Sequence, residues 1–274
     1  MDWVRFLELG GLGLVASTWG ALVGAGGGFI IVPILLLLDK SLSAATLTAV
    51  SLAAVFVSGV SGTIAYAQLR RIDYRSGAIF LACTLPGGVI GALLVNHIEK
   101  GVFQVIFGVL LMGVATYVFL SPRRPSRTGI LSRGSSRHLV DVRGTMYEYR
   151  VNLQAGAGVT FVEGFLAGML GVGGGILNVP VFVFLLGIPI HVATATSQFM
   201  VMGTSAVATI TNTLEGDLWG LWPTAIALMV GTSIGAQIGP RLSQRLSGPW
   251  VARILALGLL LVGIRLAYAG ISTL

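Results

Sequence analysis

A ten-residue stretch occurs twice in this chain and limits how the chain can fold. The sequence GAGGGFIIVP at positions 24–33 returns as GVGGGILNVP at 171–180, with six of the ten positions identical. Both copies lie inside long apolar runs, where several glycines and a proline are costly to a continuous helix. We therefore expect a broken or half-helix at each copy, and we expect the two stretches to face each other and form a substrate site. The expected helix breaks include Pro33 and Pro180.

The composition is that of a membrane protein. Apolar residues make up 55% of the chain, charged residues only 10%, and the mean hydropathy is +0.90. Soluble domains carry about a quarter charged residues, and several runs here approach the ~20 apolar residues that span a bilayer. The net charge of +7 is best explained by arginines in cytoplasmic loops rather than by nucleic-acid binding. The sequence contains no metal-ligand cluster and predicts no cofactor.

The chain divides into two transmembrane repeats, 1–120 and 151–274, joined by a basic linker, 121–150. Each half contains about five apolar segments in the same order, as is usual in secondary transporters. The matching continues beyond the glycines, since Thr48-Ala-Val-Ser51 aligns with Thr194-Ala-Thr-Ser197. The linker carries seven arginines and two acidic residues, and its end, 139–149, has the pattern of a small hairpin around Arg143-Gly144. Its start reads as a flexible linker.

Loop charges indicate that the two repeats are inverted. Arg70, Arg71 and Arg75 lie in one connection of the first half, whereas the matching connection in the second half is acidic. One connection later the bias reverses, with Arg241 and Arg245 in the second half. By the positive-inside rule, equivalent loops then lie on opposite membrane faces. The linker is therefore predicted to be cytoplasmic. Both termini are predicted to lie on the outer side of the cytoplasmic (inner) membrane.

The fold class that we predict is an all-α polytopic membrane protein with two inverted-topology repeats. Loop charges do not separate about ten spans from about six spans with two re-entrant hairpins. We favour ten segments in which the second of each half is short. The piece after the first glycines measures only ~15 Å at 1.5 Å per residue, about half of the ~30 Å hydrocarbon core.

Helices that begin just after glycines direct free backbone N–H groups at a common point, and such N-termini bind anions. The alternative is close helix packing through small residues. Nearby hydroxyl and amide side chains either bind anion oxygens, coordinate sodium, or hydrogen-bond between helices. The candidate substrate-binding residues are Gly24, Gly26, Gly27, Gly28, Gly171, Gly173, Gly174, Gly175, Asn178, Thr48, Ser51, Thr194, Thr196, Ser197 and Gln198.

Glu163 lies near the middle of the apolar run 151–170. An intramembrane carboxylate is expensive to bury and is a functional candidate by default. The matching region of the first half is apolar, so we expect Glu163 to couple transport to a proton or to pair with an arginine.

The paired GAGGGFIIVP and GVGGGILNVP stretches, each followed by a Thr-x-x-Ser segment, resemble the TauE/SafE family of sulfite exporters and toluene-sulfonate uptake permeases. The resemblance covers the chain except for the linker, which we interpret as an insertion peculiar to this protein. It implies a transporter of a sulfur-containing oxyanion, such as sulfite or an organosulfonate like sulfoacetate. Sulfur enters only through this resemblance, because the residues by themselves indicate only an anion.

The sequence thus predicts a secondary transporter that alternates access around a midplane site. The alternatives are an anion channel and a transporter of a non-sulfur small anion. We expect no enzymatic activity, because the sequence has no Walker motif, no nucleophile–base motif and no Cys/His cluster. A coupling H⁺ or Na⁺ and the lipid bilayer are the other expected partners. A monomer and a homodimer remain equally open.

Overall fold

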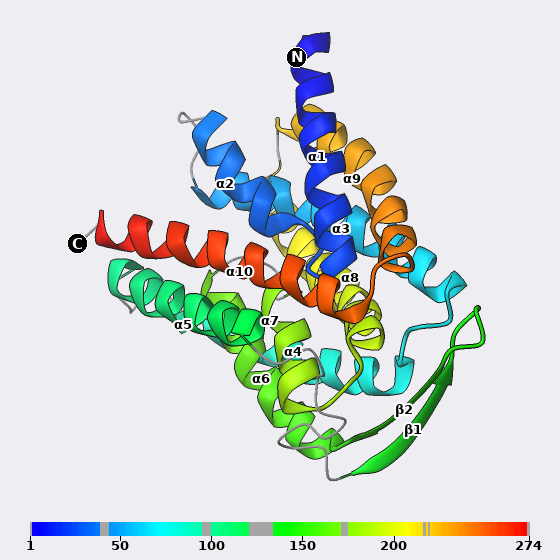
Figure 1. The fold of residues 1–274 in the computed structure, drawn as a ribbon. Coiled ribbons are helices and arrows are strands. Elements are labelled where there is room, and N and C mark those ends of the chain that lie inside the picture. Colours follow the sequence, from blue (N-terminus) through cyan, green and yellow to red (C-terminus); the bar gives the residue numbers. More distant parts are fainter. Residues whose placement is uncertain are drawn as a thin grey trace.

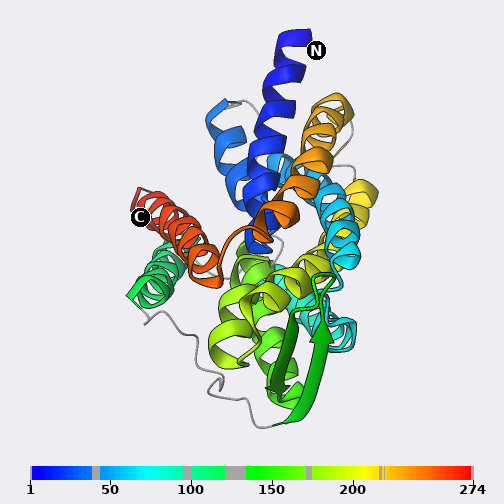
Figure 2. The same cartoon turned by 45° about the vertical axis from the view of Figure 1, so that its right-hand side comes forward.

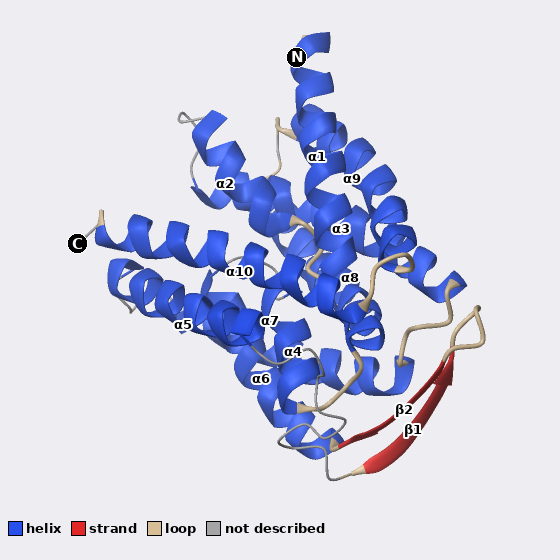
Figure 3. Cartoon of the chain, viewed as in Figure 1, coloured by secondary structure: helices blue, strands red, loops and turns tan. Residues whose placement is uncertain are grey.

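The computed structural model describes residues 2–38, 44–94, 100–120, 134–170, 175–215, 218 and 220–272. Within these ranges the helices and loops are interrupted by strands at one hairpin alone (Figure 3). The all-α class predicted for the two repeats is therefore confirmed. Three helical segments have both the length and the apolar composition to cross a membrane: α1, the part of α3 from Ala49 to Gln68, and α10.

Each half contributes five α-helices in the part of the chain that is described. Those of the first half are α1 (Trp3–Val23), α2 (Gly28–Leu38), α3 (Ala44–Gln68), α4 (Tyr74–Leu94) and α5 (Lys100–Leu120). Those of the second half are α6 (Leu153–Leu170), α7 (Gly175–Pro180), α8 (Ile190–Glu215), α9 (Trp222–Ser243) and α10 (Gly248–Ile271). A π-helical stretch, η2 (Val181–Leu185), continues α7. The second segment of each half is short, as predicted: α2 has 11 residues and α7 has six.

The helices pack in pairs that join the two halves. α1 runs beside α9, α6 beside α4, and α5 beside α10 (Figures 1 and 2). α3 contacts both α8 and α9 in the middle of the bundle. Because all these contacts are long-range in sequence, each half is held mainly by the other half.

Small residues allow the paired helices to approach closely. A Cβ added at Gly231 or Gly235 of α9 would overlap the backbone of α1 at Gly10 or Leu14. A Cβ at Gly164 of α6 would likewise overlap α4. Spacing of small residues at intervals of four is the usual way for membrane helices to pack, because van der Waals contact replaces the hydrophobic effect there.

The linker contains the predicted hairpin. β1 (Ser135–Val140) and β2 (Met146–Val151) pair antiparallel, with Val140 opposite Met146. The turn passes through Gly144, whose φ of 77° lies in the left-handed region that glycine adopts without strain. The hairpin lies along one end of the helical bundle (Figure 1), and Val142 N–H donates to the carbonyl of Leu69 at the end of α3. The predicted flexible start of the linker lies outside the described residues.

Candidate functional site

The first glycine stretch breaks the chain between α1 and α2, as predicted. Gly24 ends α1 in the left-handed conformation with φ 79°, and Gly26 and Gly27 have φ 75° and 98°. Ala25 N–H bonds back to the carbonyl of Gly20 at 2.7 Å, which completes a C-terminal cap. α2 then begins at Gly28. Three left-handed residues in four positions are accessible at low cost only to glycine.

Pro33 does not produce this break. α2 continues through position 33, so that the prediction of a helix break at Pro33 is wrong, and the glycines alone end α1. At the matching place in the second half, regular α-helix does end at Pro180 and η2 follows. A proline removes one backbone donor, which a helix accommodates by a local change of hydrogen-bond spacing.

The break is buried against α8. A Cβ on Gly24 would lie 2.6 Å from the carbonyl oxygen of Thr194, and one on Gly26 would lie 2.7 Å from Val201. The Ser197 hydroxyl donates to the carbonyl of Gly24 at 2.5 Å. The first glycine stretch therefore contacts the Thr-x-x-Ser segment of the other half.

The described parts of the two glycine stretches are in contact. Gly171, Gly173 and Gly174 lie outside the described residues, but Gly175 begins α7. A Cβ on Gly175 would lie 2.8 Å from the carbonyl oxygen of Ala25 and 2.9 Å from its Cα. The start of α7 is thus in van der Waals contact with the break between α1 and α2.

Free backbone donors lie at the start of α2. The N–H groups of Ile30 and Ile31 bond back to the carbonyl of Gly27, at 3.0 and 3.2 Å. Those of Gly28 and Phe29 have no hydrogen-bond partner in the described part of the chain. Unpaired N–H groups and the helix dipole together attract an anion.

The predicted hydroxyl and amide ligands are largely occupied by other partners. Thr194 Oγ1 donates to the carbonyl of His191, and Gln198 Nε2 donates to that of Ser58. Thr196 Oγ1 accepts the N–H of Asp73. With the Ser197 bond to Gly24, three of these four side chains have donors engaged with backbone carbonyls. The Ser197 and Gln198 bonds join α8 to the first half, whereas the Thr194 bond to His191 lies within α8.

The other predicted ligands are less informative. Ser51 is buried, whereas the side chain of Thr48 lies outside the described residues. Gln198 Oε1 is buried with no hydrogen-bond partner in the described part of the chain. A lone acceptor suits a cation or water rather than an anion. In the described part of this break, the N–H groups of Gly28 and Phe29 remain without a hydrogen-bond partner.

Glu163 is paired with Asn178, and the sequence did not predict this contact. Glu163 of α6 is 3% exposed and Asn178 of α7 is 2% exposed. In the orientation of the Asn178 amide that satisfies both groups, its nitrogen lies 2.5 and 2.8 Å from the two Glu163 carboxylate oxygens. The opposite orientation presents the amide oxygen, which accepts a hydrogen bond from a protonated carboxyl. One amide can thus satisfy both protonation states, and it lies on the helix that begins at the second glycine stretch.

Comparison with known proteins places this architecture in a family. The model of the family described as "Sulfite exporter TauE/SafE" matches residues 9–266. The chain belongs to the TauE/SafE family. A relative in Bacillus subtilis (strain 168), the probable membrane transporter protein YunE, is 32% identical over 275 residues, which covers 98% of this chain and 99% of YunE.

More distant relatives carry similar names. The probable membrane transporter protein YfcA of Escherichia coli (strain K12) is 27% identical and covers 91% of this chain and 87% of YfcA. One from Methanocaldococcus jannaschii is 23% identical and covers 86% of this chain and 85% of that relative. No solved structure matches significantly. The family and these names show a membrane transporter.

The interpretation of the linker as an insertion peculiar to this protein stays a prediction. The structure gives the linker a role in packing, because its hairpin is bonded to the helical bundle both near its tip and near its base.

At the base of the hairpin, the hydroxyl of Tyr149 donates to Asp73 Oδ2 at 2.8 Å. Asp73 also accepts the Ser76 hydroxyl at 2.6 Å, and Arg137 Nε lies 3.8 Å from Asp73 Oδ2. Burial, together with the nearby Asp73 carboxylate, raises the pKa of Tyr149. Since the N–H of Asp73 donates to Thr196, the hairpin base is connected through one residue to α8.

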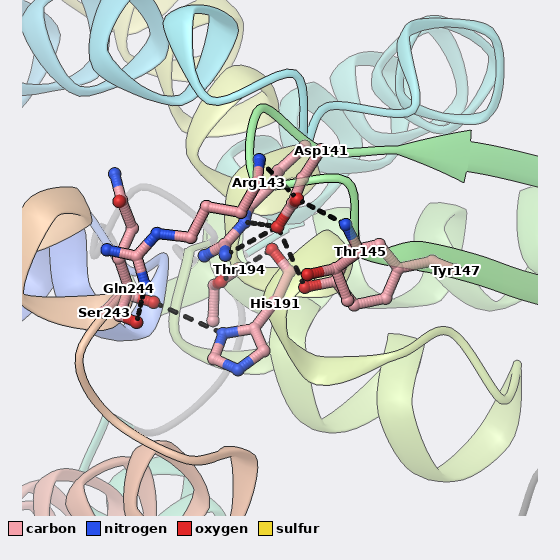
Figure 4. Close-up of polar contacts among 9 residues, drawn as sticks. Asp141, Arg143, Thr145, Tyr147, His191, Thr194, Ser243 and Gln244 are labelled. Atoms are coloured by element: carbon pink, nitrogen blue, oxygen red, sulfur yellow. Dashed lines mark hydrogen bonds and ion pairs between the residues drawn. The ribbon is translucent and has the colours of Figure 1, made fainter.

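At the tip, Asp141 forms a buried ion pair with Arg71. Figure 4 shows Asp141 with its neighbours Arg143, Thr145 and Tyr147. Arg71 Nε and Nη2 donate to Asp141 Oδ2 at 3.2 and 2.9 Å, while the N–H groups of Arg143 and Thr145 donate to Oδ1. Arg143 Nη1 adds a bond to the carbonyl of Gln244. Sequence reasoning missed this cluster. Its signal was the presence of two acidic residues, Asp141 and Glu148, in an otherwise arginine-rich linker.

This ion pair predicts that the tip separates from the bundle in acid. Burial alone would raise the pKa of Asp141, but the bonds from Arg71 and from the Thr145 and Arg143 N–H groups outweigh it and lower the pKa below 3.8. A lowered pKa stabilises docking at pH values above 3.8, and this contribution is lost as the pH falls through the lowered value. Breaking one side of a buried pair costs about 3 kcal/mol.

Spin labels at exposed Met146 and Leu242 measure this separation. The distance between them should be constant from pH 7 to 5 and increase as the pH falls below 3.8 and through the lowered pKa of Asp141. In Asp141→Asn, the longer distance should already be present at pH 7. An unchanged distance at low pH in the native sequence would contradict the prediction.

Proposed function

We propose that this protein is a secondary transporter of a small sulfur-containing anion, sulfite or an organosulfonate such as sulfoacetate. The anion binds at a midplane site where the two glycine stretches meet. The observation that carries the proposal is the contact of Gly175 with Ala25, beside the unpaired N–H groups of Gly28 and Phe29. The family description, sulfite exporter, supplies the sulfur.

The pairing of helices supports an inverted repeat. α1 and α6 are the first helices of the two halves, and α9 and α4 are the fourth helices. The contacts α1–α9 and α4–α6 are therefore equivalent under exchange of the halves, as is expected for repeats related by a two-fold axis. Together with the loop charges, this arrangement supports our proposal that the linker is cytoplasmic and that both termini lie on the outer side of the membrane.

The same geometry supports our proposal of alternating access. The first glycine break lies between its own half and the other half, because α2 contacts α1 and α3 while Gly24 and Gly26 lie against α8. Rocking of one repeat against the other changes which side of the site is open. We further propose that a proton on Glu163 is coupled to this motion through Asn178.

Counterflow in proteoliposomes tests the proposal. Vesicles that contain the purified protein and are loaded with unlabelled sulfite under nitrogen should accumulate labelled sulfite transiently, because a carrier exchanges bound substrates across the membrane. Sulfoacetate, acetate and chloride inside the vesicles serve as comparisons. Flux without counterflow would favour an anion channel. Counterflow with acetate alone would favour a non-sulfur substrate, and no flux of any of these anions would contradict the proposal.

A further inference from the structure

The ion pair at the hairpin tip leaves the arginine only partly satisfied. Both bonds from Arg71, through Nε and Nη2, end on one oxygen of Asp141, Oδ2. The other oxygen, Oδ1, is occupied by the N–H groups of Arg143 and Thr145 in the turn. A bidentate pair would use two carboxylate oxygens. Only one of the two Asp141 carboxylate oxygens therefore accepts hydrogen bonds from the guanidinium.

Arg71 Nη1 has no hydrogen-bond partner within the described residues, although the Arg71 side chain is 5% exposed. Buried polar groups are nearly always paired, and an exception calls for an unseen partner. The planar fork of a guanidinium matches oxyanions better than any other side chain does. The free nitrogen therefore points to a ligand with several anionic oxygens.

The position of Arg71 connects it to the first glycine stretch. It follows the end of α3 and lies within electrostatic reach of Tyr66 and His191. The Tyr66 hydroxyl donates to the carbonyl of Ala21 at 2.8 Å, three residues before Gly24. Thr194, which lies close to His191 in Figure 4, contacts Gly24 through its backbone. An anion on Arg71 would thus lie one layer of side chains away from the break.

We propose that Arg71 is an anion-binding residue at this end of the protein and that the Asp141 carboxylate occupies its site while the hairpin is docked. A small oxyanion, of the class given under the proposed function on which this inference rests, displaces Asp141 and engages Nη1 as well. The tip then leaves the bundle, while the Tyr149–Asp73 bond keeps the hairpin base attached. The hairpin is in effect a tethered competitor for the anion.

Titration calorimetry of sulfite into the purified full chain tests this competition. Asp141→Asn removes the competing charge but retains an oxygen for the Arg143 and Thr145 N–H groups. If the native site is open about one-tenth of the time, the variant should bind sulfite about tenfold more tightly. Tyr149→Phe is the matched control, since it loosens the hairpin base without touching Arg71, and it should change the affinity little.

Adding Arg71→Gln to Asp141→Asn should abolish the gain. Asp141→Ser, which also retains a turn acceptor, replaces Asp141→Asn if that variant does not fold. An unchanged or weaker affinity in a folded Asp141 variant would overturn the inference, as would an equal gain in Tyr149→Phe. Because these readouts are binding constants, sulfite counterflow by the native protein together with an unchanged affinity would refute this inference and leave the proposed function standing.

Discussion

We expect Gly27→Leu to abolish the proposed sulfite flux and to lower the stability of the protein. A side chain at position 27 must adopt a φ of 98°, which costs about 1–2 kcal/mol in the left-handed region. Its Cβ would also lie 2.8 Å from the carbonyl oxygen of Ala16 and 3.1 Å from Ser17 Cα. Overpacking against a fixed backbone adds about 1–3 kcal/mol.

The reason for this loss is a displaced helix rather than a filled site. The Cβ of residue 27 points at α1, so the substitution moves the start of α2 and with it the N–H groups of Gly28 and Phe29. Thermal unfolding and counterflow of the same purified variant should therefore decline together. Gly27→Ala should show the same effect to a smaller degree.

Gly220→Ala is the matched control, since Gly220 has φ 80° and nothing lies within 4 Å of an added Cβ. This variant carries the backbone cost alone, and we expect it to retain flux. Normal flux and stability in Gly27→Leu would show that transport does not depend on the close contact between the glycine break and α1.

Glu163→Gln should give transport that no longer varies with pH. The glutamine retains the shape of Glu163 and a hydrogen bond to Asn178, whose nitrogen lies 2.5 and 2.8 Å from the carboxylate oxygens, but it cannot exchange a proton. Counterflow of sulfite, measured from pH 5 to 8 in the native protein and the variant, gives the comparison. A pH profile that is unchanged by the substitution would exclude Glu163 as the coupling group.

Asn178→Ala tests the Asn178–Glu163 hydrogen bond while it keeps the Glu163 carboxylate. It leaves Glu163 buried without its donor, which costs on the order of 3 kcal/mol while the carboxylate is charged. We therefore expect this variant to be less stable than Glu163→Gln, most clearly at high pH, and the double substitution to recover stability. Equal stability of Asn178→Ala and the native protein at all pH values would show that the amide does not satisfy the carboxylate.

Local features of the sequence were predicted well because they depend on near neighbours. The break at Gly24–Gly28 follows from backbone conformations that are accessible only to glycine, and the hairpin follows from alternation around Arg143-Gly144. The short second segment in each half follows from the length of an apolar run. Pro33 was a local feature too, but an α-helix can continue through a proline when its neighbours compensate for one missing donor.

The sequence contained no comparable local signal for the contacts between distant segments. Which carbonyl receives the Ser197 hydroxyl depends on α8 lying against the α1–α2 break, and this in turn depends on the pairing of α1 with α9 and of α4 with α6. The Glu163–Asn178 and Arg71–Asp141 pairs arise in the same way, since each joins residues whose helices or strands meet only after packing. Sequence by itself thus determined a membrane protein with a glycine break between α1 and α2 and a hairpin in the linker. Tertiary structure decided which polar groups are satisfied and which remain free, because a buried hydrogen bond is set by the neighbour that packing supplies and not by the residue's own segment.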